Sequence, residues 1–217
     1  LGIRNMYREG MRLMEESIAG LGEPSGREAL ELKGWLLSSL GWFCSFCGSA
    51  AQSIGYLEEA VGTFRSAGSD HGLADALNVL GNVLYVSGDS ERAFAAYEES
   101  LGIRRGLSDG PGVAAVLNNL GNLSCQKTEY EQARAYYQES LRLQRISGNQ
   151  HGISSILSNL AIVSIALDDL KDAGLMLGEA LELEMNIGDR FNSAIVQGIM
   201  CELHLKTGNL EEVEKLC

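Results

Sequence analysis

Apolar and small residues recur along this chain with the spacing of an amphipathic helix. One helical face, with members at i, i+3, i+4 and i+7, holds Leu77, Leu80, Gly81 and Leu84. A second face with related spacing holds Ala93, Tyr97, Ser100 and Leu101. Between the two segments, Gly88-Asp89 has the composition of a helix stop followed by a turn. The pattern predicts two antiparallel helices, which we call helix A and helix B of a helical hairpin.

The hairpin pattern recurs every 40 residues. The helix A segment LNVLGNVLYVSGD begins at Leu77 and recurs as LNNLGNLSCQKTE and LSNLAIVSIALDD. The helix B segment AFAAYEESLGIRR begins at Ala93 and recurs as ARAYYQESLRLQR and AGLMLGEALELEM. Self-similarity at a fixed period of this length is typical of helical repeat arrays. We therefore expect an all-α fold of stacked hairpins, in which Gly81 and Gly121 are small because helix B packs against helix A there.

These motifs resemble the tetratricopeptide repeat, whose helix A carries large, large, small and large residues and whose helix B carries small, aromatic and small residues. The resemblance implies a right-handed superhelix (α-solenoid) of antiparallel hairpins, with helix A lining a concave face. The usual period of that family is about 34 residues. The longer period here is similar to the long-repeat branch found in kinesin light chains and many bacterial regulators. Repeat four departs from the pattern, with Ala161 in place of glycine and Leu177 in place of tyrosine.

The same register divides residues 1–217 into a single array. It predicts an orphan helix B, four whole repeats and a truncated fifth repeat: 2–21, 25–66, 70–107, 110–147, 150–187 and 190–217. Ser25 and Glu28 have capping-box spacing at the start of the first whole repeat. Because the chain starts at Leu1 without a methionine and stops at Cys217 inside a helical pattern, we expect it to be a piece of a longer protein.

Charge and composition limit the classes of partner that we expect for this chain. The chain has 17 basic and 29 acidic residues, a net charge of −12. Such a surface repels nucleic-acid phosphates, so we expect no nucleic-acid contact by this segment and a preference for a basic partner. No apolar run reaches the roughly 18 to 20 residues that cross a bilayer, so no membrane association is expected. The five irregularly spaced cysteines favour a reducing, cytoplasmic location.

Candidate chemistry is sparse in the sequence. His71 and His151 occupy the same repeat position, where they are expected to help begin helix A. Cys44 and Cys47 have CxxC spacing, but a second ligand pair for zinc is missing, and core or interface cysteines are the favoured interpretation. The acidic pairs that recur in helix B, among them Glu58-Glu59 and Glu98-Glu99, fit a solvated outer face. We expect no catalytic residue, no metal and no cofactor, and hence no enzyme.

Groove-facing positions of helix A are the candidate binding residues. Asn78, Asn82, Asn118 and Asn122 form a ladder of amides that can donate to and accept from a peptide backbone. The alternative is that these asparagines bridge neighbouring helices. Further groove positions hold Tyr85, Gln126, Trp35 and Trp42. The two tryptophans form either an exposed contact surface or a packing surface for the orphan helix or a preceding domain.

The leading functional hypothesis is a scaffold that binds a peptide or an adjacent domain on its concave face. The segment REGMRLMEESI at residues 8–18, the tryptophan-rich first repeat and the later repeats resemble the C-terminal sensor region of large bacterial signalling-ATPase transcriptional regulators. The resemblance implies that the array gates upstream domains of the same polypeptide. Two alternatives stay open: a solenoid that senses a small effector, and an element for homo-oligomerisation.

Overall fold

The computed structural model describes residues 2–22, 24, 26–46 and 49–216, with side chains described from residue 9 to residue 213. Over these residues the chain is helical and has no strand. The helices are α1 (Gly2–Leu21), α2 (Arg27–Phe46), α3 (Ala50–Ala67), α4 (Asp70–Ser87), α5 (Ser90–Gly106), α6 (Gly110–Gln126), α7 (Tyr130–Ser147), α8 (Gln150–Ala166), α9 (Leu170–Ile187), α10 (Arg190–Thr207) and α11 (Leu210–Leu216). None of the described helices is long and apolar enough to cross a membrane.

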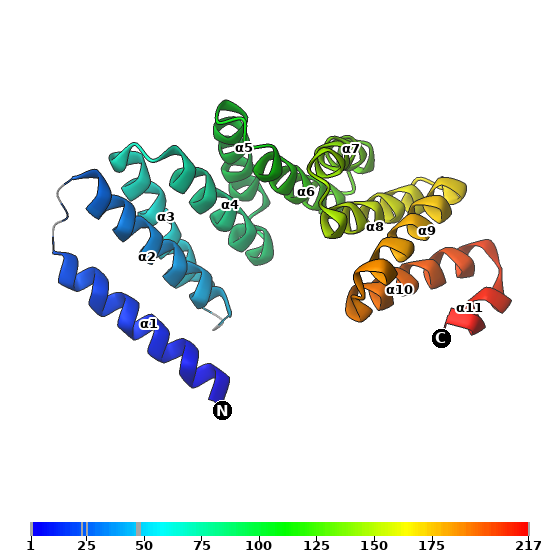
Figure 1. Ribbon diagram of the computed structural model, residues 1–217, viewed down its shortest axis with the longest axis horizontal. Coiled ribbons are helices and arrows are strands. Elements are labelled where there is room, and N and C mark those ends of the chain that lie inside the picture. The colour runs from blue at the N-terminus through cyan, green and yellow to red at the C-terminus, as the bar shows by residue number, and fades with distance from the viewer. Residues whose placement is uncertain (1, 23, 25, 47–48, 217) are drawn as a thin grey trace. The chain divides into compact units, whose positions relative to one another are not determined.

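Consecutive helices pack as antiparallel hairpins: α2 with α3, α4 with α5, α6 with α7, and α8 with α9 (Figure 1). The all-α fold of tetratricopeptide-like hairpins is therefore confirmed. The chain divides into two compact units, unit 1 at 1–109 and unit 2 at 110–217. In unit 1, α1 packs on α2, and α4 contacts both α2 and α3. In unit 2, α8 contacts α6 and α7, and α10 contacts α8, α9 and α11.

Helix A ends in a left-handed residue at each hairpin turn that the structure describes in full. Gly88 has φ 86°, its N–H donates to the carbonyl of Tyr85, and the N–H of Asp89 donates to the carbonyl of Leu84. Glycine adopts this conformation without strain, which explains its place at the end of α4. In unit 2 the equivalent positions hold Thr128 and Asp168, with φ 60° and 68°. The left-handed turn is thus kept where the glycine is lost.

The predicted close approach at Gly81 is confirmed. A Cβ atom built on Gly81 would lie 2.5 Å from the ring of Tyr97, which is 1% exposed. Gly121 has the same relation to the ring of Tyr137. Each tyrosine ring of helix B therefore fills the space that a side chain on helix A would need. Repeat four holds Ala161 because its helix B presents the smaller Leu177.

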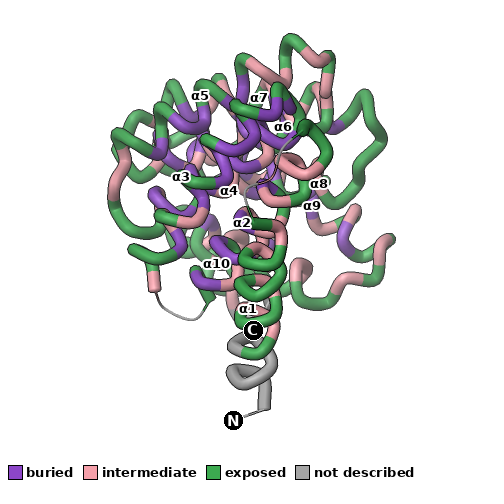
Figure 2. The backbone as a smooth tube through the Cα atoms, turned by 90° about the vertical axis from the view of Figure 1, so that its left-hand side faces the viewer, coloured by how far each residue is buried: buried purple, intermediate pink, exposed green. Residues whose placement is uncertain are grey.

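Buried serines tie helix B to helix A in two successive hairpins. The hydroxyl of Ser100 donates to the carbonyl of Ala74 at 2.7 Å, and the hydroxyl of Ser140 donates to the carbonyl of Ala114 at 2.7 Å. A larger residue at either serine would separate the helices, which explains the small residue of the pattern. Buried stretches alternate with exposed ones along the helices, as expected for amphipathic faces (Figure 2).

The acidic pairs of helix B are exposed, as predicted, but they also carry ion pairs between helices. Arg92 of α5 pairs with Glu58 of α3, and Arg65 of α3 pairs with Glu99 of α5 at 2.6 Å. Lys33 pairs with Glu59 at 2.8 Å. Exposed pairs of this kind contribute about 0 to 1 kcal/mol each, so they support the stacking of successive hairpins only weakly.

Some sequence predictions fall on residues outside the described set. Ser25 of the predicted capping box and Cys47 of the CxxC pair are two of these. Within the described chain, Cys44 is fully buried and reduced. Its burial among apolar side chains supports the interpretation of Cys44 as a core residue.

Candidate functional site

Unit 1 places the predicted groove residues on two neighbouring helices. Trp35 and Trp42 lie on α2, and Asn78, Asn82 and Tyr85 lie on α4. The tryptophans are 44% and 47% exposed with α1 packed on α2. Asn82 is exposed, whereas Asn78 and Tyr85 are half-buried. Helix A faces in this unit therefore present aromatic and amide groups to solvent.

A cavity of about 540 Å³ opens between α2 and α4. Its lining residues are Trp42, Ser45, Phe46, Ala50, Val79, Asn82, Val83, Val86 and Ser87. We call this cavity the Trp42 pocket. It brings together Trp42 and Asn82 of the predicted site, whereas Trp35 and Tyr85 are not part of its lining. Val79 and Val83 were not predicted as groove residues, because the repeat pattern places their neighbours Asn78 and Asn82 on the groove face instead.

The Trp42 pocket has an exposed aromatic rim. The rings of Trp42 and Phe46 meet edge to face, with centroids 4.5 Å apart. Phe46 is 59% exposed and Val86 is 84% exposed. Clustered exposed apolar side chains of this kind mark contact surfaces. Trp35, by contrast, packs edge to face on Phe64 at 5.1 Å, which gives it a structural partner.

Asn82 joins the pocket to the helical framework. Its Oδ1 accepts a hydrogen bond from the hydroxyl of Tyr97 at 2.7 Å. Burial raises the pKa of Tyr97, so this hydroxyl stays a neutral donor. Among the described residues the amide NH₂ of Asn82 has no hydrogen-bond partner. One end of the side chain is therefore fixed while the donor end faces the exposed side of α4.

In unit 2 the predicted asparagines also bond across helices. Oδ1 of Asn122 accepts from the hydroxyl of Tyr137 at 2.7 Å. Oδ1 of Asn118 accepts from the amide of Asn159 at 2.9 Å, which links α6 to α8. These bonds support the bridging alternative for Asn118 and Asn122. The exposed Gln126 lies at the end of α6. The ladder as a ligand-binding element stays a prediction.

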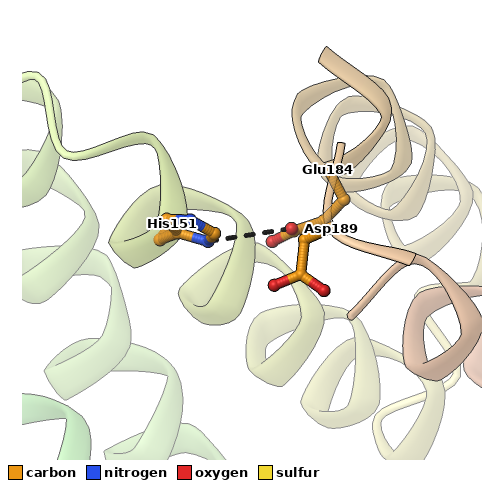
Figure 3. A group of neighbouring side chains, drawn as sticks. All are labelled: His151, Glu184 and Asp189. Carbon is orange, nitrogen blue, oxygen red and sulfur yellow. Dashed lines mark ion pairs between the residues drawn. The ribbon is translucent and has the colours of Figure 1, made fainter. Parts of the chain in front are cut away.

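A histidine and two carboxylates that were not predicted to act together lie side by side in unit 2. His151 is the second residue of α8, Glu184 lies in the last turn of α9, and Asp189 is the N-cap of α10 (Figure 3). Their ligand atoms lie within 4.8 Å of one another. Glu184 is 2% exposed, and it lines a cavity of about 430 Å³ with His151. The sequence does contain one indication of this site: the 40-residue register makes residue 184 equivalent to Arg104 and Gln144, so a carboxylate stands where earlier repeats have a basic or a neutral side chain.

Two models of the tetratricopeptide repeat match this chain, one over residues 73–108 and one over residues 112–184, together half of its length. The chain belongs to the tetratricopeptide repeat family. Tetratricopeptide arrays, like other helical repeat arrays, build extended surfaces from successive repeats. A comparison with curated proteins found no match.

Solved structures show the same tetratricopeptide fold. BtubC (BKLC) from P. vanneervenii is 20% identical with a TM-score of 0.85, covering 100% of this chain and 88% of that one. A signal transduction ATPase with numerous domains, with a tetratricopeptide repeat sensor, from Pyrococcus horikoshii is 18% identical with a TM-score of 0.81, covering 98% of this chain and 32% of that one. A Rap protein complexed with competence and sporulation factor is 12% identical with a TM-score of 0.72, covering 97% and 62%.

Proposed function

We propose that this tetratricopeptide array is a non-catalytic scaffold that binds a peptide or an adjacent protein domain on its helix A faces, with the Trp42 pocket as the main anchor. The observation that carries the proposal is the exposed aromatic rim of Trp42 and Phe46 beside the amide of Asn82. Aromatic side chains in pockets at the centre of an interface commonly supply most of its binding free energy.

The lining of the Trp42 pocket indicates which chemical groups the partner needs. An apolar side chain of the partner enters between Trp42, Phe46 and Val86, and the NH₂ of Asn82 donates to a backbone carbonyl of the partner. The net charge of −12 favours a basic segment. Secondary contacts in unit 1 come from Asn78 and Tyr85, whereas Trp35 packs on Phe64 and is not needed for binding. In unit 2 the predicted residues Asn118, Asn122 and Gln126 offer a helix A face of their own.

A regulatory role fits this binding. The structurally similar protein from Pyrococcus horikoshii is a signal transduction ATPase with a tetratricopeptide repeat sensor, and the similar Rap protein was solved with competence and sporulation factor bound. We propose that the array likewise senses a partner and transmits its presence to other domains of a larger cytoplasmic signalling protein. Nucleic acids and membranes are not partners of this segment under the proposal.

A small effector is the second candidate ligand for the same pocket. The cavity volume of about 540 Å³ lies within the range of roughly 300 to 1,000 Å³ typical of small-molecule sites. An apolar compound with one acceptor for Asn82 would fit its lining. The peptide is favoured because Phe46 and Val86 in the cavity lining are strongly exposed, and a peptide covers more of this apolar surface than a small compound does.

The test uses the fact that both tryptophans of the chain lie on α2. Peptides are selected from a random-peptide phage library on the chain and then titrated against Trp35→Phe, in which Trp42 is the only indole. Under the proposal, the selected peptides are basic with an apolar anchor, and they shift and enhance the emission of Trp42. Trp42→Ala is expected to weaken their binding at least tenfold.

Trp35→Phe is the matched control, because Trp35 packs on Phe64 outside the pocket lining, and it should bind the selected peptides like the parent chain. Circular dichroism melts show whether each variant keeps its fold. Peptides that bind equally well to Trp42→Ala would contradict the proposal. Emission changes with small apolar compounds but with no peptide would favour the effector, and concentration-dependent changes without ligand would favour homo-oligomerisation.

A further inference from the structure

One position near the end of helix B changes its chemistry from hairpin to hairpin. In unit 1, the guanidinium of Arg104 is 11% exposed and lies between two carboxylates. Its Nη1 donates to Asp109 at 2.6 Å, and its Nη2 donates to Asp75. Asp109 stands five residues after Arg104. In this hairpin a largely buried cation thus has a carboxylate on either side of it.

The next hairpin uses a neutral pair at the same two places. Gln144 takes the position of Arg104, and Asn149 takes the position of Asp109. Oε1 of Gln144 accepts a hydrogen bond from the side-chain amide of Asn149 at 2.9 Å. Polar groups are again matched, now without charge.

The following hairpin has two carboxylates at these places, Glu184 and Asp189. Glu184 is 2% exposed, and among the described residues its Oε2 has no hydrogen-bond partner. The nearest basic group is Nδ1 of His151, at 3.8 Å (Figure 3). A buried carboxylate without a partner is costly, and a second carboxylate beside it increases the cost. The position held by a cation in unit 1 therefore lacks one in unit 2.

Asp189 is held in a fixed orientation by its neighbours. Its Oδ1 accepts from the backbone N–H groups of Phe191 and Asn192, both at 3.0 Å, and its Oδ2 accepts from the side-chain amide of Asn192 at 3.0 Å. Both lone pairs of Oδ1 are therefore occupied, whereas Oδ2 keeps one lone pair for a ligand. The side chain of Glu184 is equally fixed, by burial, whereas the imidazole of His151 is about half exposed and free to adjust.

We infer that His151, Glu184 and Asp189 bind a divalent transition-metal ion. One imidazole nitrogen and two carboxylate oxygens within 4.8 Å of one another form a ligand set that suits Zn²⁺ or Mn²⁺, with water completing the coordination. The adjoining cavity, lined also by Ser158 and Asn192, has room for that water. A divalent ion supplies two positive charges for two carboxylates, whereas a protonated His151 supplies one. The inference is independent of peptide binding at the Trp42 pocket.

His71 provides an internal control for the experiment. It stands 80 residues before His151, and its unit has Asp109 at the place of Asp189 but Arg104 at the place of Glu184. A histidine and one aspartate are thus present in both units, and only the glutamate distinguishes them. Metal binding that depends on Glu184 must survive His71→Ala.

The test is calorimetric titration of the tag-free chain with ZnCl₂, and in parallel with MnCl₂ and MgCl₂, together with thermal melts in each salt. We expect one saturable site for Zn²⁺ or Mn²⁺ and a rise in melting temperature that a chelator reverses. Glu184→Gln and His151→Ala are each expected to weaken binding at least tenfold, and His71→Ala to leave it unchanged. Asp189→Asn keeps the helix cap and should also weaken binding, should Glu184→Gln not fold.

Three results would overturn the inference. The first is a chain that binds none of these ions. The second is an affinity that Glu184→Gln and Asp189→Asn leave unchanged. The third is an equal loss in His71→Ala and His151→Ala, which would indicate adventitious binding by exposed histidines. Stabilisation by lysine or arginine amides without any response to metal would instead assign the two carboxylates to an organic cation and would also contradict the metal site.

Discussion

Units 1 and 2 have the same internal framework and different exposed chemistry. Gly81 and Tyr97 in unit 1 repeat as Gly121 and Tyr137 in unit 2, and in both units the tyrosine ring fills the space beside the glycine. In both units the tyrosine hydroxyl also donates a hydrogen bond to an asparagine. The cavities differ. The Trp42 pocket of unit 1 is mostly apolar and has an aromatic rim, whereas the cavity beside Glu184 in unit 2 combines serines, asparagines, a histidine and a buried glutamate with aliphatic residues.

The comparison separates two classes of position in this array. Positions where helix B touches helix A keep their size or change as a complementary pair, as Ala161 with Leu177 shows, since interiors are close-packed and tolerate little change in volume. Positions on the helix A face and at the end of helix B change freely, as the series Arg104, Gln144 and Glu184 shows. We therefore assign stability to the first class and binding to the second.

We expect the largest change in the free energy of unfolding when unit 1 is given the acidic pair of unit 2. Arg104→Glu removes a buried cation and leaves Asp75 and Asp109 facing a third carboxylate. We expect a loss of about 3 kcal/mol in the free energy of unfolding, as for a broken buried ion pair, measured by urea denaturation. With His71 nearby, Zn²⁺ should restore part of this loss. Arg65→Gln, which breaks an exposed pair, serves as the control and should cost less than about 1 kcal/mol.

A smaller loss is expected from Gly81→Ala, which introduces a Cβ atom 2.5 Å from the ring of Tyr97. Overpacking of this kind costs about 2 kcal/mol. The double variant Gly81→Ala with Tyr97→Leu copies the pair Ala161 and Leu177 of unit 2, and it should be more stable than the sum of the single changes predicts. Gly102→Ala, with open space around it, should not destabilise the chain. Additive losses in the double variant would show that the two units do not share a framework.

The hydrogen bond from Tyr137 to Asn122 should contribute about 1 kcal/mol to the free energy of unfolding. Asn122→Ala, Tyr137→Phe and the double variant form a thermodynamic cycle, measured by thermal and urea unfolding. A coupling energy near that value assigns Asn122 to the framework. If the cycle shows no coupling and peptide binding falls instead, Asn122 belongs to the binding face.

We expect the smallest change in the free energy of unfolding from the contact between α1 and α3 in unit 1. The hydroxyl of Tyr56 on α3 donates to Glu15 of α1 at 2.7 Å, and this bond raises the pKa of Tyr56 to about 12. Because the folded-state pKa lies above the usual value of about 10, the stabilisation is present below pH 10 and is lost between pH 10 and 12. Tyr56→Phe should cost about 0.5 kcal/mol at pH 7 and weaken this pH dependence. An unchanged alkaline unfolding profile in Tyr56→Phe would count against the bond.

Much of the fold was predictable from the sequence, because helical periodicity and the 40-residue register reflect local rules. The close approach of Gly81 to the opposite helix followed from its small size in the pattern. The left-handed conformations of Thr128 and Asp168 could not be predicted from the sequence, because no glycine stands at these positions.

The candidate sites were less predictable. The lining of the Trp42 pocket by Val79 and Val83 depends on how α2 and α4 are placed against each other, which spacing on one helix does not define. Glu184 was not recognised in the sequence, since a glutamate in an acidic helix resembles a solvated residue, and its burial is a property of the structure. Its role became visible only when it was compared with Arg104 and Gln144 at the same place in the repeat.

The central claim is that binding belongs to the variable helix A faces and stability to the repeated framework. Hydrogen–deuterium exchange of the chain with and without a selected peptide tests it most directly. We expect protection in α2 and α4, around Trp42, Phe46 and Asn82, with little change in the outward faces of α3 and α5. Protection confined to α3 and α5 would contradict it.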